Sequence, residues 1–345
     1  MLTIDAMFQK STETIRRWFS RSQGRPDSMD PVFGSALPLS ENPLAALGQL
    51  EMISRRMADG LLSGKHRSTH RGGCTDFTEH RPYSNGDDVR MIDWRMHAKN
   101  DRYHIKQYED ETNLKAILAV DASGSMSYSG KQRNGANAAS KFDIARTVAS
   151  CLARIMVRQR DAVGLAIIGE TISNTLPPRC RPETIIQLNE ALAVAKLQGR
   201  SNLGACLTET AARNRSRGML ILLSDCLCSL PDLKKGLLAW AQAGHDVIVV
   251  EVLAADEIDF SFRGSMILEN LEQPGQKLDI DPGNVRHAYL ERMQKHRAAL
   301  RNTVTSCRGE LISIRNDESI GDVLKRFLQR RASSAGGASA GRARR

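Results

Sequence analysis

The chain has 345 residues, of which 41% are hydrophobic and 26% charged, and its formal net charge is +10 at pH 7. This balance favours a globular protein with one large core and a smaller flanking unit. No apolar run approaches the roughly 20 residues that a membrane-spanning helix requires, and the amino-terminal segment lacks the apolar core of a secretory signal. We therefore expect a cytoplasmic protein without a membrane span.

The seven cysteines are scattered and odd in number. This pattern favours reduced, buried thiols over a disulfide framework.

The two ends of the chain differ from its middle in composition. Residues 1–42 mix charge, Gly and Pro, and we predict that they are partly disordered. Residues 332–345 join arginines through Ala, Ser and Gly, which is typical of a disordered basic tail. Much of the excess positive charge lies near this tail, so the net charge says little about the partner of the folded part.

A segment at residues 43–112 precedes the main repeating pattern. Asn42 and Pro43 supply a cap and a first-turn proline ahead of leucines at helical spacing, which predicts a helix that ends at Gly60 or Gly64. The rest of the segment is rich in charge and turn residues, with short alternating pieces such as RYHIKQYE that could form strands. We expect a small charged α+β segment here.

From residue 113 to 331, apolar strand-like runs alternate with amphipathic helix-like runs. Strands are predicted at 114–120, 162–169, 218–224, 246–253 and 310–315, and helices near 141–158, 182–195, 231–243, 285–305 and 319–331. Residues 259–281 interrupt the alternation and are expected to form an inserted hairpin or loop. The alternation predicts a doubly wound, mostly parallel α/β sheet of the Rossmann type.

Oxygen-bearing side chains follow two of the predicted strands and one loop. Asp121, Ser123 and Ser125 follow the first strand, Ser201 stands at a loop-to-helix turn, and Asp225 ends a central strand. Ligands of open α/β sheets collect at the carboxyl ends of strands, and carboxylate and hydroxyl oxygens suit Mg²⁺. These five residues are therefore our predicted metal ligands, with Mn²⁺ or Ca²⁺ as other cations they could hold.

The same five positions resemble the metal-ion-dependent adhesion site (MIDAS) of von Willebrand factor A domains. That site has an Asp-x-Ser-x-Ser motif, a later hydroxyl residue and an Asp after an apolar strand. Here Ser201 stands where Thr is usual, and Cys226 replaces the usual Gly after Asp225. The resemblance implies a von Willebrand A-like fold that binds protein partners through the metal.

A second motif lies before the predicted sheet and contains, in order, Arg81, Tyr83, Gly86, Asp87, Arg90, Ile92, Asp93 and Trp94. It resembles the signature of the domain-of-unknown-function 58 family, whose members carry it ahead of a von Willebrand A-like domain. The resemblance covers about residues 45–330 and implies association with a MoxR-type AAA+ ATPase, which the chain would serve as an adaptor or partner in protein assembly or maturation. The signature positions considered for interaction are Arg81, Tyr83, Gly86, Asp87, Arg90, Asp93 and Trp94.

Three other kinds of chemistry fit less well. A Mg²⁺-assisted phosphohydrolase would use the same aspartates, but no histidine lies in the three metal loops. His66, His70 and Cys74 share a helical spacing, but two glycines lie among them. Nucleic-acid binding would rest on the basic tail and on a basic helix without interleaved aromatics, formed by Arg286, Arg292, Lys295, Arg297 and Arg301.

The sequence thus favours a non-enzymatic, metal-dependent protein-interaction module. A partner Asp or Glu would complete the shell of the metal held by Asp121 and the other four residues, so that the cation bridges two proteins.

Overall fold

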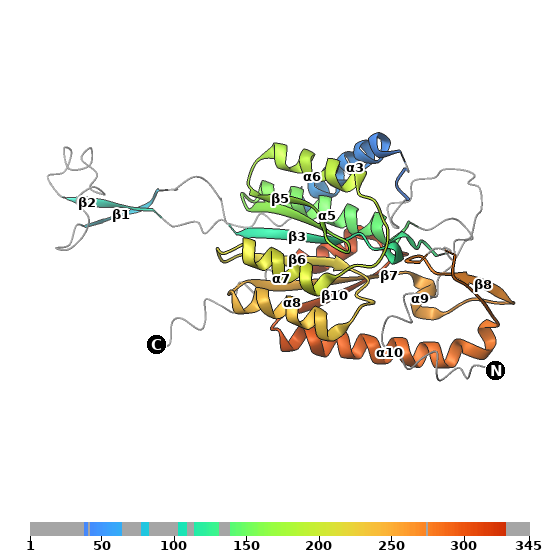
Figure 1. Cartoon of the computed structure of the whole chain (residues 1–345). Coiled ribbons are helices and arrows are strands. Elements are labelled where there is room, and N and C mark those ends of the chain that lie inside the picture. Colours follow the sequence, from blue (N-terminus) through green and yellow to red (C-terminus); the bar gives the residue numbers. More distant parts are fainter. Residues whose placement is uncertain are drawn as a thin grey trace.

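The computed structural model describes residues 38–40, 42–63, 77–82, 103–108, 114–130, 139–273 and 275–328 (Figure 1). Six strands form its central sheet in the order β10-β7-β6-β3-β4-β5. Neighbouring strands are parallel except for β4 and β5, which are antiparallel. The strands are β3 (Lys115–Asp121), β4 (Ala162–Ile168), β5 (Ile172–Arg179), β6 (Met219–Ser224), β7 (Asp246–Leu253) and β10 (Glu310–Arg315).

Helices cover both faces of this sheet (Figure 1). One face packs against α3 (Pro43–Ser63), α5 (Lys141–Arg158), α6 (Pro182–Val194) and a helix at 320–328. The other packs against α7 (Leu203–Arg213), α8 (Leu230–Gln242) and α10 (Pro282–Ser306). Burial on both faces explains why β3 and β6 read as continuous apolar runs. The predicted fold class, a doubly wound and mostly parallel α/β sheet, is confirmed.

The predicted insertion at 259–281 contains a hairpin, and a short helix directly precedes it. Helix α9 (Ala255–Asp259) follows β7, and β8 (Met266–Glu269) pairs in antiparallel register with β9 (Lys277–Ile280). The insertion has a small core of its own, in which Phe260 contacts Tyr289 of α10 at a ring separation of 4.6 Å. It therefore adds a small packed unit beside the carboxyl end of the sheet.

The segment before the sheet contributes α3 and a two-stranded antiparallel pair of β1 (Phe77–Pro82) and β2 (His104–Tyr108). Helix α3 begins at Pro43 and ends at Ser63, as the cap and glycine signals predict. Arg81 is paired with Ile105 in the ladder. The other signature positions, from Tyr83 to Trp94, lie outside the described residues, as do the predicted disordered ends and the trio His66, His70 and Cys74.

Two features differ from the expectations. Residues 172–179 form the edge strand β5, which the sequence pattern does not predict, because five of its eight residues are exposed and two prolines interrupt the run. Cys180 is exposed, whereas the other five described cysteines are buried. Within the described residues, no helix is long and apolar enough to cross a membrane.

Candidate functional site

The predicted metal ligands lie where β3 and β6 end. Asp121 is the last residue of β3, and Asp225 directly follows β6. The two strands are neighbours, with Val120 paired to Leu223, so their carboxyl ends open at the same edge of the sheet. Asp121 and Asp225 are both fully buried there.

The third loop, which carries Ser201, is tied to the first by backbone hydrogen bonds. The Gly124 N–H donates to the Gly199 carbonyl over 2.9 Å, and the Gln198 N–H donates to the Ala122 carbonyl over 3.3 Å. Gly124 begins a short 3₁₀ helix, η2 (Gly124–Ser127), which turns the chain back toward Asp121. Residues 80 positions apart in the chain, Asp121 and Ser201, therefore meet at one point.

All five predicted ligands belong to one hydrogen-bonded network. The Ser125 hydroxyl donates to Asp225 Oδ2 over 2.7 Å, and its oxygen lies 3.0 Å from Ser123 Oγ. The Ser201 hydroxyl lies 3.4 Å from Asp121 Oδ2. The Ser123 N–H donates to Asp121 Oδ1 over 2.9 Å and holds that carboxylate in place. The network thus gathers two carboxylates and three hydroxyls from three loops.

Lys141, the first residue of α5, extends into this network from the side. Its ammonium group donates to Asp225 Oδ2 over 2.9 Å and to Glu257 Oε1 of α9 over 2.6 Å, and all three side chains are buried. Burial by itself would lower the pKa of Lys141, but the two carboxylates raise it above its ordinary value. The lysine therefore stays an ammonium ion and bridges two carboxylates that would otherwise repel each other.

The sequence reading missed three residues of this network: Ser224, Lys141 and Glu257. The Ser224 hydroxyl donates to Asp121 Oδ2 over 2.6 Å, and its place between an apolar strand and Asp225 was the available signal. Lys141 directly follows the N-cap Ser140, and a lysine at the start of a helix is normally expected to be exposed to solvent. Glu257 lies 116 positions from Lys141, and no sequence spacing connects the two.

The loop after Asp225 adopts the backbone conformation that glycine favours. Cys226 has a φ of 51°, and its thiol is fully buried. Its N–H donates to Ser224 Oγ over 2.9 Å, while the Leu227 N–H donates to Asp225 Oδ1 over 3.0 Å. Cys226 therefore adopts the tight turn that glycine favours, and the Leu227 N–H holds the Asp225 carboxylate in place. His296 of α10 lies 2.9 Å from the Cys226 carbonyl, a contact that sequence order does not reveal.

The donor set fits a hard divalent cation. Every side chain that the network offers, apart from Lys141, presents oxygen, which Mg²⁺ and Ca²⁺ prefer. With all carboxyls ionised, Asp121, Asp225 and Glu257 carry three negative charges against one positive charge on Lys141, so a dication would neutralise the cluster. Among the described residues, no group of three or more His, Cys, Asp or Glu side chains could hold a metal. The serines and water would therefore have to supply the remaining ligands.

The insertion covers part of this site. A Cβ atom on Gly124 would lie 2.2 Å from the Leu271 carbonyl oxygen, so η2 and the insertion are in direct backbone contact. Arg200, next to Ser201, has its Nε 3.7 Å from Glu272 Oε2 of the insertion. Of the five predicted ligands, Ser201 alone is half-buried and the other four are buried. Access from solvent is therefore on the Ser201 side.

The basic helix considered for nucleic acid uses much of its charge internally. Arg286 donates to the backbone carbonyls of Phe260 and Asp259. Arg297 pairs with Glu251 over 3.2 Å, and Lys295 pairs with Glu291 over 2.6 Å. These bonds reduce the charge that α10 offers to a phosphate backbone.

Comparisons with known proteins match the chain to one family model and to mycobacterial relatives. The family model described as "Protein of unknown function DUF58" matches residues 79–299. Uncharacterized protein Rv1480 of Mycobacterium tuberculosis is 26% identical over 298 residues, which cover 85% of this chain and 91% of that protein. Uncharacterized protein Mb1516 of Mycobacterium bovis matches to the same extent.

Solved structures show more distant similarity. An aerotolerance-related membrane protein from Bacteroides fragilis has a TM-score of 0.41 and 16% identity, covering 63% of this chain and 99% of that one. The SpRpn10 VWA domain has a TM-score of 0.35 and 10% identity, covering 62% of this chain and 95% of that one.

Proposed function

The chain belongs to the DUF58 family of proteins of unknown function, and from this premise we propose that it is a non-enzymatic protein-interaction module whose binding depends on a divalent cation. The observation that carries the proposal is the network of Asp121, Ser123, Ser125, Ser201 and Asp225 at the carboxyl ends of β3 and β6. These oxygen donors come from three separate loops. A stable turn by itself does not require that convergence.

Mg²⁺ is the cation that we propose for this site, with Asp121 and the serines as its nearest ligands. Asp225 Oδ2 already accepts hydrogen bonds from Ser125 and Lys141, so its role is to hold those groups and to contribute charge. A bound cation supplies an electrostatic attraction for one further oxygen ligand. We propose that a partner's Asp or Glu provides that ligand from the Ser201 side.

The partner that the family resemblance implies is a MoxR-type AAA+ ATPase. A metal bridge makes such an association reversible, because it is lost when the cation is removed. The chain would then act as an adaptor between the ATPase and its client proteins.

The test is the Asp121→Ala variant in the full chain. Calorimetric titration with Mg²⁺ and with Mn²⁺ should show binding to the wild type and at least about a tenfold loss in the variant, because the carboxylate proposed to contact the cation directly is gone. Pull-down with the MoxR-type ATPase should succeed with Mg²⁺ and fail with EDTA or with Asp121→Ala. The matched control is Asp232→Ala, an exposed aspartate on α8, which should behave as wild type.

The metal site and the metal bridge to the ATPase are tested separately. Equal metal binding by wild type and a folded Asp121→Ala variant would reject the metal site. Association with the ATPase that persists in EDTA would reject the metal bridge and leave a metal-independent surface. Ser201→Ala is a milder second variant, since Ser201 is half-buried and its loss leaves both carboxylates in place.

A further inference from the structure

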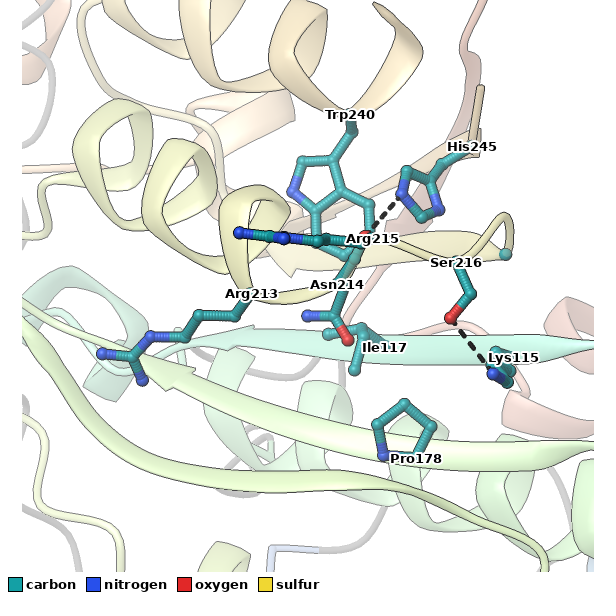
Figure 2. A pocket seen from close by; sticks show the side chains of 10 residues that line it. Lys115, Ile117, Pro178, Arg213, Asn214, Arg215, Ser216, Trp240 and His245 are labelled. Carbon is teal, nitrogen blue, oxygen red and sulfur yellow. Dashed lines mark hydrogen bonds between the residues drawn. The ribbon is translucent and has the colours of Figure 1, made fainter. Parts of the chain in front are cut away.

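Charged side chains lie at both ends of the central sheet, and those at the carboxyl end converge. At the amino end, Lys115, Arg213 and Arg215 line a hollow, but the two arginine side chains extend away from the lysine (Figure 2). At the carboxyl end, the Lys141 ammonium group is buried against two carboxylates, one of which is that of Asp225. The charges at the carboxyl end can therefore act together on one bound ion.

The Asp225 carboxylate accepts hydrogen bonds on both of its oxygens. Oδ2 accepts from the Lys141 ammonium group over 2.9 Å and from the Ser125 hydroxyl over 2.7 Å. Oδ1 accepts from the Leu227 N–H over 3.0 Å. The ammonium group therefore offsets the charge of Asp225 directly and occupies the oxygen that it shares with Ser125.

Glu257 fixes the same ammonium group from helix α9. Lys141 Nζ lies 2.6 Å from Glu257 Oε1, and Glu257 Oε2 accepts from the Ala254 N–H over 2.8 Å. The Tyr289 hydroxyl donates to the Glu257 backbone carbonyl over 2.9 Å. The side chains of Lys141, Asp225 and Glu257 are at most 1% exposed, so salt and water screen their charges little. Lys141 is thus a fixed positive charge in direct contact with a predicted metal ligand.

A dication held by Asp121 and the serines would be repelled by this fixed charge. With both carboxyls ionised, Asp121 and Asp225 contribute two negative charges, and Lys141 offsets one of them. We propose that Lys141 sets the affinity of the candidate metal site, because its ammonium group opposes the charge of the cation and keeps Asp225 Oδ2 occupied. This inference rests on the metal site of the proposed function and adds the residue that limits how tightly that site binds a cation.

The limited affinity links cation binding to partner binding. A carboxylate from a partner restores the negative charge that Lys141 offsets, so the cation and the partner each strengthen the binding of the other. Removing the ammonium group should therefore let the chain bind Mg²⁺ tightly without a partner.

Calorimetric titration of the full chain with Mg²⁺ tests the role of Lys141 through two substitutions of opposite charge. Lys141→Met should tighten Mg²⁺ binding at least about tenfold, because it removes a repelling charge and frees Asp225 Oδ2. Glu257→Gln should weaken Mg²⁺ binding about threefold or more, because it removes a negative charge and leaves the ammonium group to Asp225 alone. Damage to the local structure would weaken binding in both variants, so opposite directions identify an effect of charge.

The matched control is Lys235→Met, which removes an exposed lysine of α8 and should change the Kd for Mg²⁺ by less than about twofold. Weaker or unchanged Mg²⁺ binding in a folded Lys141→Met variant would overturn the inference. If that variant does not fold, the Lys141→Met/Glu257→Gln double variant is compared with Glu257→Gln. The double variant should bind Mg²⁺ at least about tenfold more tightly, and equal binding would again overturn the inference.

Asp121→Ala distinguishes a failure of this inference from a failure of the proposed function. Mg²⁺ binding that is lost in Asp121→Ala but unchanged in Lys141→Met would support the metal site and overturn the role of Lys141. Mg²⁺ binding by Lys141→Met but not by the wild type would support the role of Lys141 and overturn the use of Mg²⁺ by the wild-type chain. Absence of binding in both would reject the two together.

Discussion

Lys141 determines the charge balance of the candidate metal centre. Its ammonium group is held between the carboxylates of Asp225 and Glu257, and none of the three side chains reaches solvent. Burial raises the pKa of the Glu257 carboxyl, and the nearby ammonium opposes that rise. The charges of the three side chains therefore stabilise one another. Removing the Lys141 ammonium group would leave two buried carboxylates close together.

Replacing this lysine should destabilise the fold strongly. We expect Lys141→Met to lower the free energy of unfolding by about 3–5 kcal/mol, the usual effect of removing one partner of a buried ion pair. Urea unfolding followed by circular dichroism measures this loss. The matched control, Lys235→Met, removes an exposed lysine of α8 and should change stability by less than about 0.5 kcal/mol.

A double variant tests whether the loss comes from the charge network. Adding Glu257→Gln to Lys141→Met removes one of the two stranded carboxylates and should recover part of the lost stability. Additive losses from the two substitutions would contradict the coupling between these side chains.

The sequence predicted that Asp121 and Asp225 lie together, but it did not predict the Lys141 ammonium group between Asp225 and Glu257. Asp121 and Asp225 follow apolar strands, and parallel strands bring their ends together, so local pattern and fold class were sufficient. Lys141 gives no comparable signal, because a lysine in the first turn of a helix is usually exposed. Its burial depends on Glu257, which helix α9, far along the chain, brings into contact.

Among the elements, the helices were predictable because burial of one face imposes a helical period, and the central strands because burial of both faces gives continuous apolar runs. Helix α5 begins at Lys141 and ends at Arg158, as the apolar spacing indicates. The strand β5 was not predictable. Five of its eight residues are exposed, and Pro177 and Pro178 are tolerated because it lies at the edge of the sheet.

The 3₁₀ helix η2, which carries Ser125, packs directly against the insertion. Gly124→Ala would place a methyl group 2.2 Å from the Leu271 carbonyl oxygen, and this backbone atom cannot move without moving the insertion. We expect a loss of about 1–3 kcal/mol of stability. Hydrogen exchange at residues 260–273 should become faster in the variant.

Gly48 of α3 offers a matched control for this substitution. A Cβ atom there meets nothing within 4 Å, and alanine favours a helix more than glycine does. Gly48→Ala should therefore leave stability unchanged or raise it by up to about 1 kcal/mol. Unchanged exchange in the insertion of Gly124→Ala would show that η2 and the insertion are not closely packed in solution.

At the scale of the whole molecule, α3 joins the amino-terminal segment to the α/β core. Leu50 is fully buried in the core cluster that includes α5 and α6. Glu51 pairs with Arg154 of α5, and it accepts from the Asn189 side chain of α6 over 2.9 Å. Arg154 also donates to Ser54 Oγ over 3.1 Å. The helix at the start of the segment predicted at 43–112 is thus packed on the sheet domain as part of its core.

This packing predicts that α3 and the sheet unfold together. Leu50→Ala should reduce the free energy of unfolding by about 2–5 kcal/mol, since it leaves a cavity between α3 and the helices beneath it. Leu44→Ala, at a position that is 77% exposed on the same helix, should have an effect of less than about 0.5 kcal/mol. Hydrogen exchange distinguishes joint unfolding of α3 and the sheet from independent unfolding of α3. If α3 belongs to the same cooperative unit, the most protected amides of β6 and β7 lose protection by the full change in stability. If it unfolds independently, only the amides of α3 and its immediate contacts on α5 and α6 become less protected, and the sheet retains its wild-type protection.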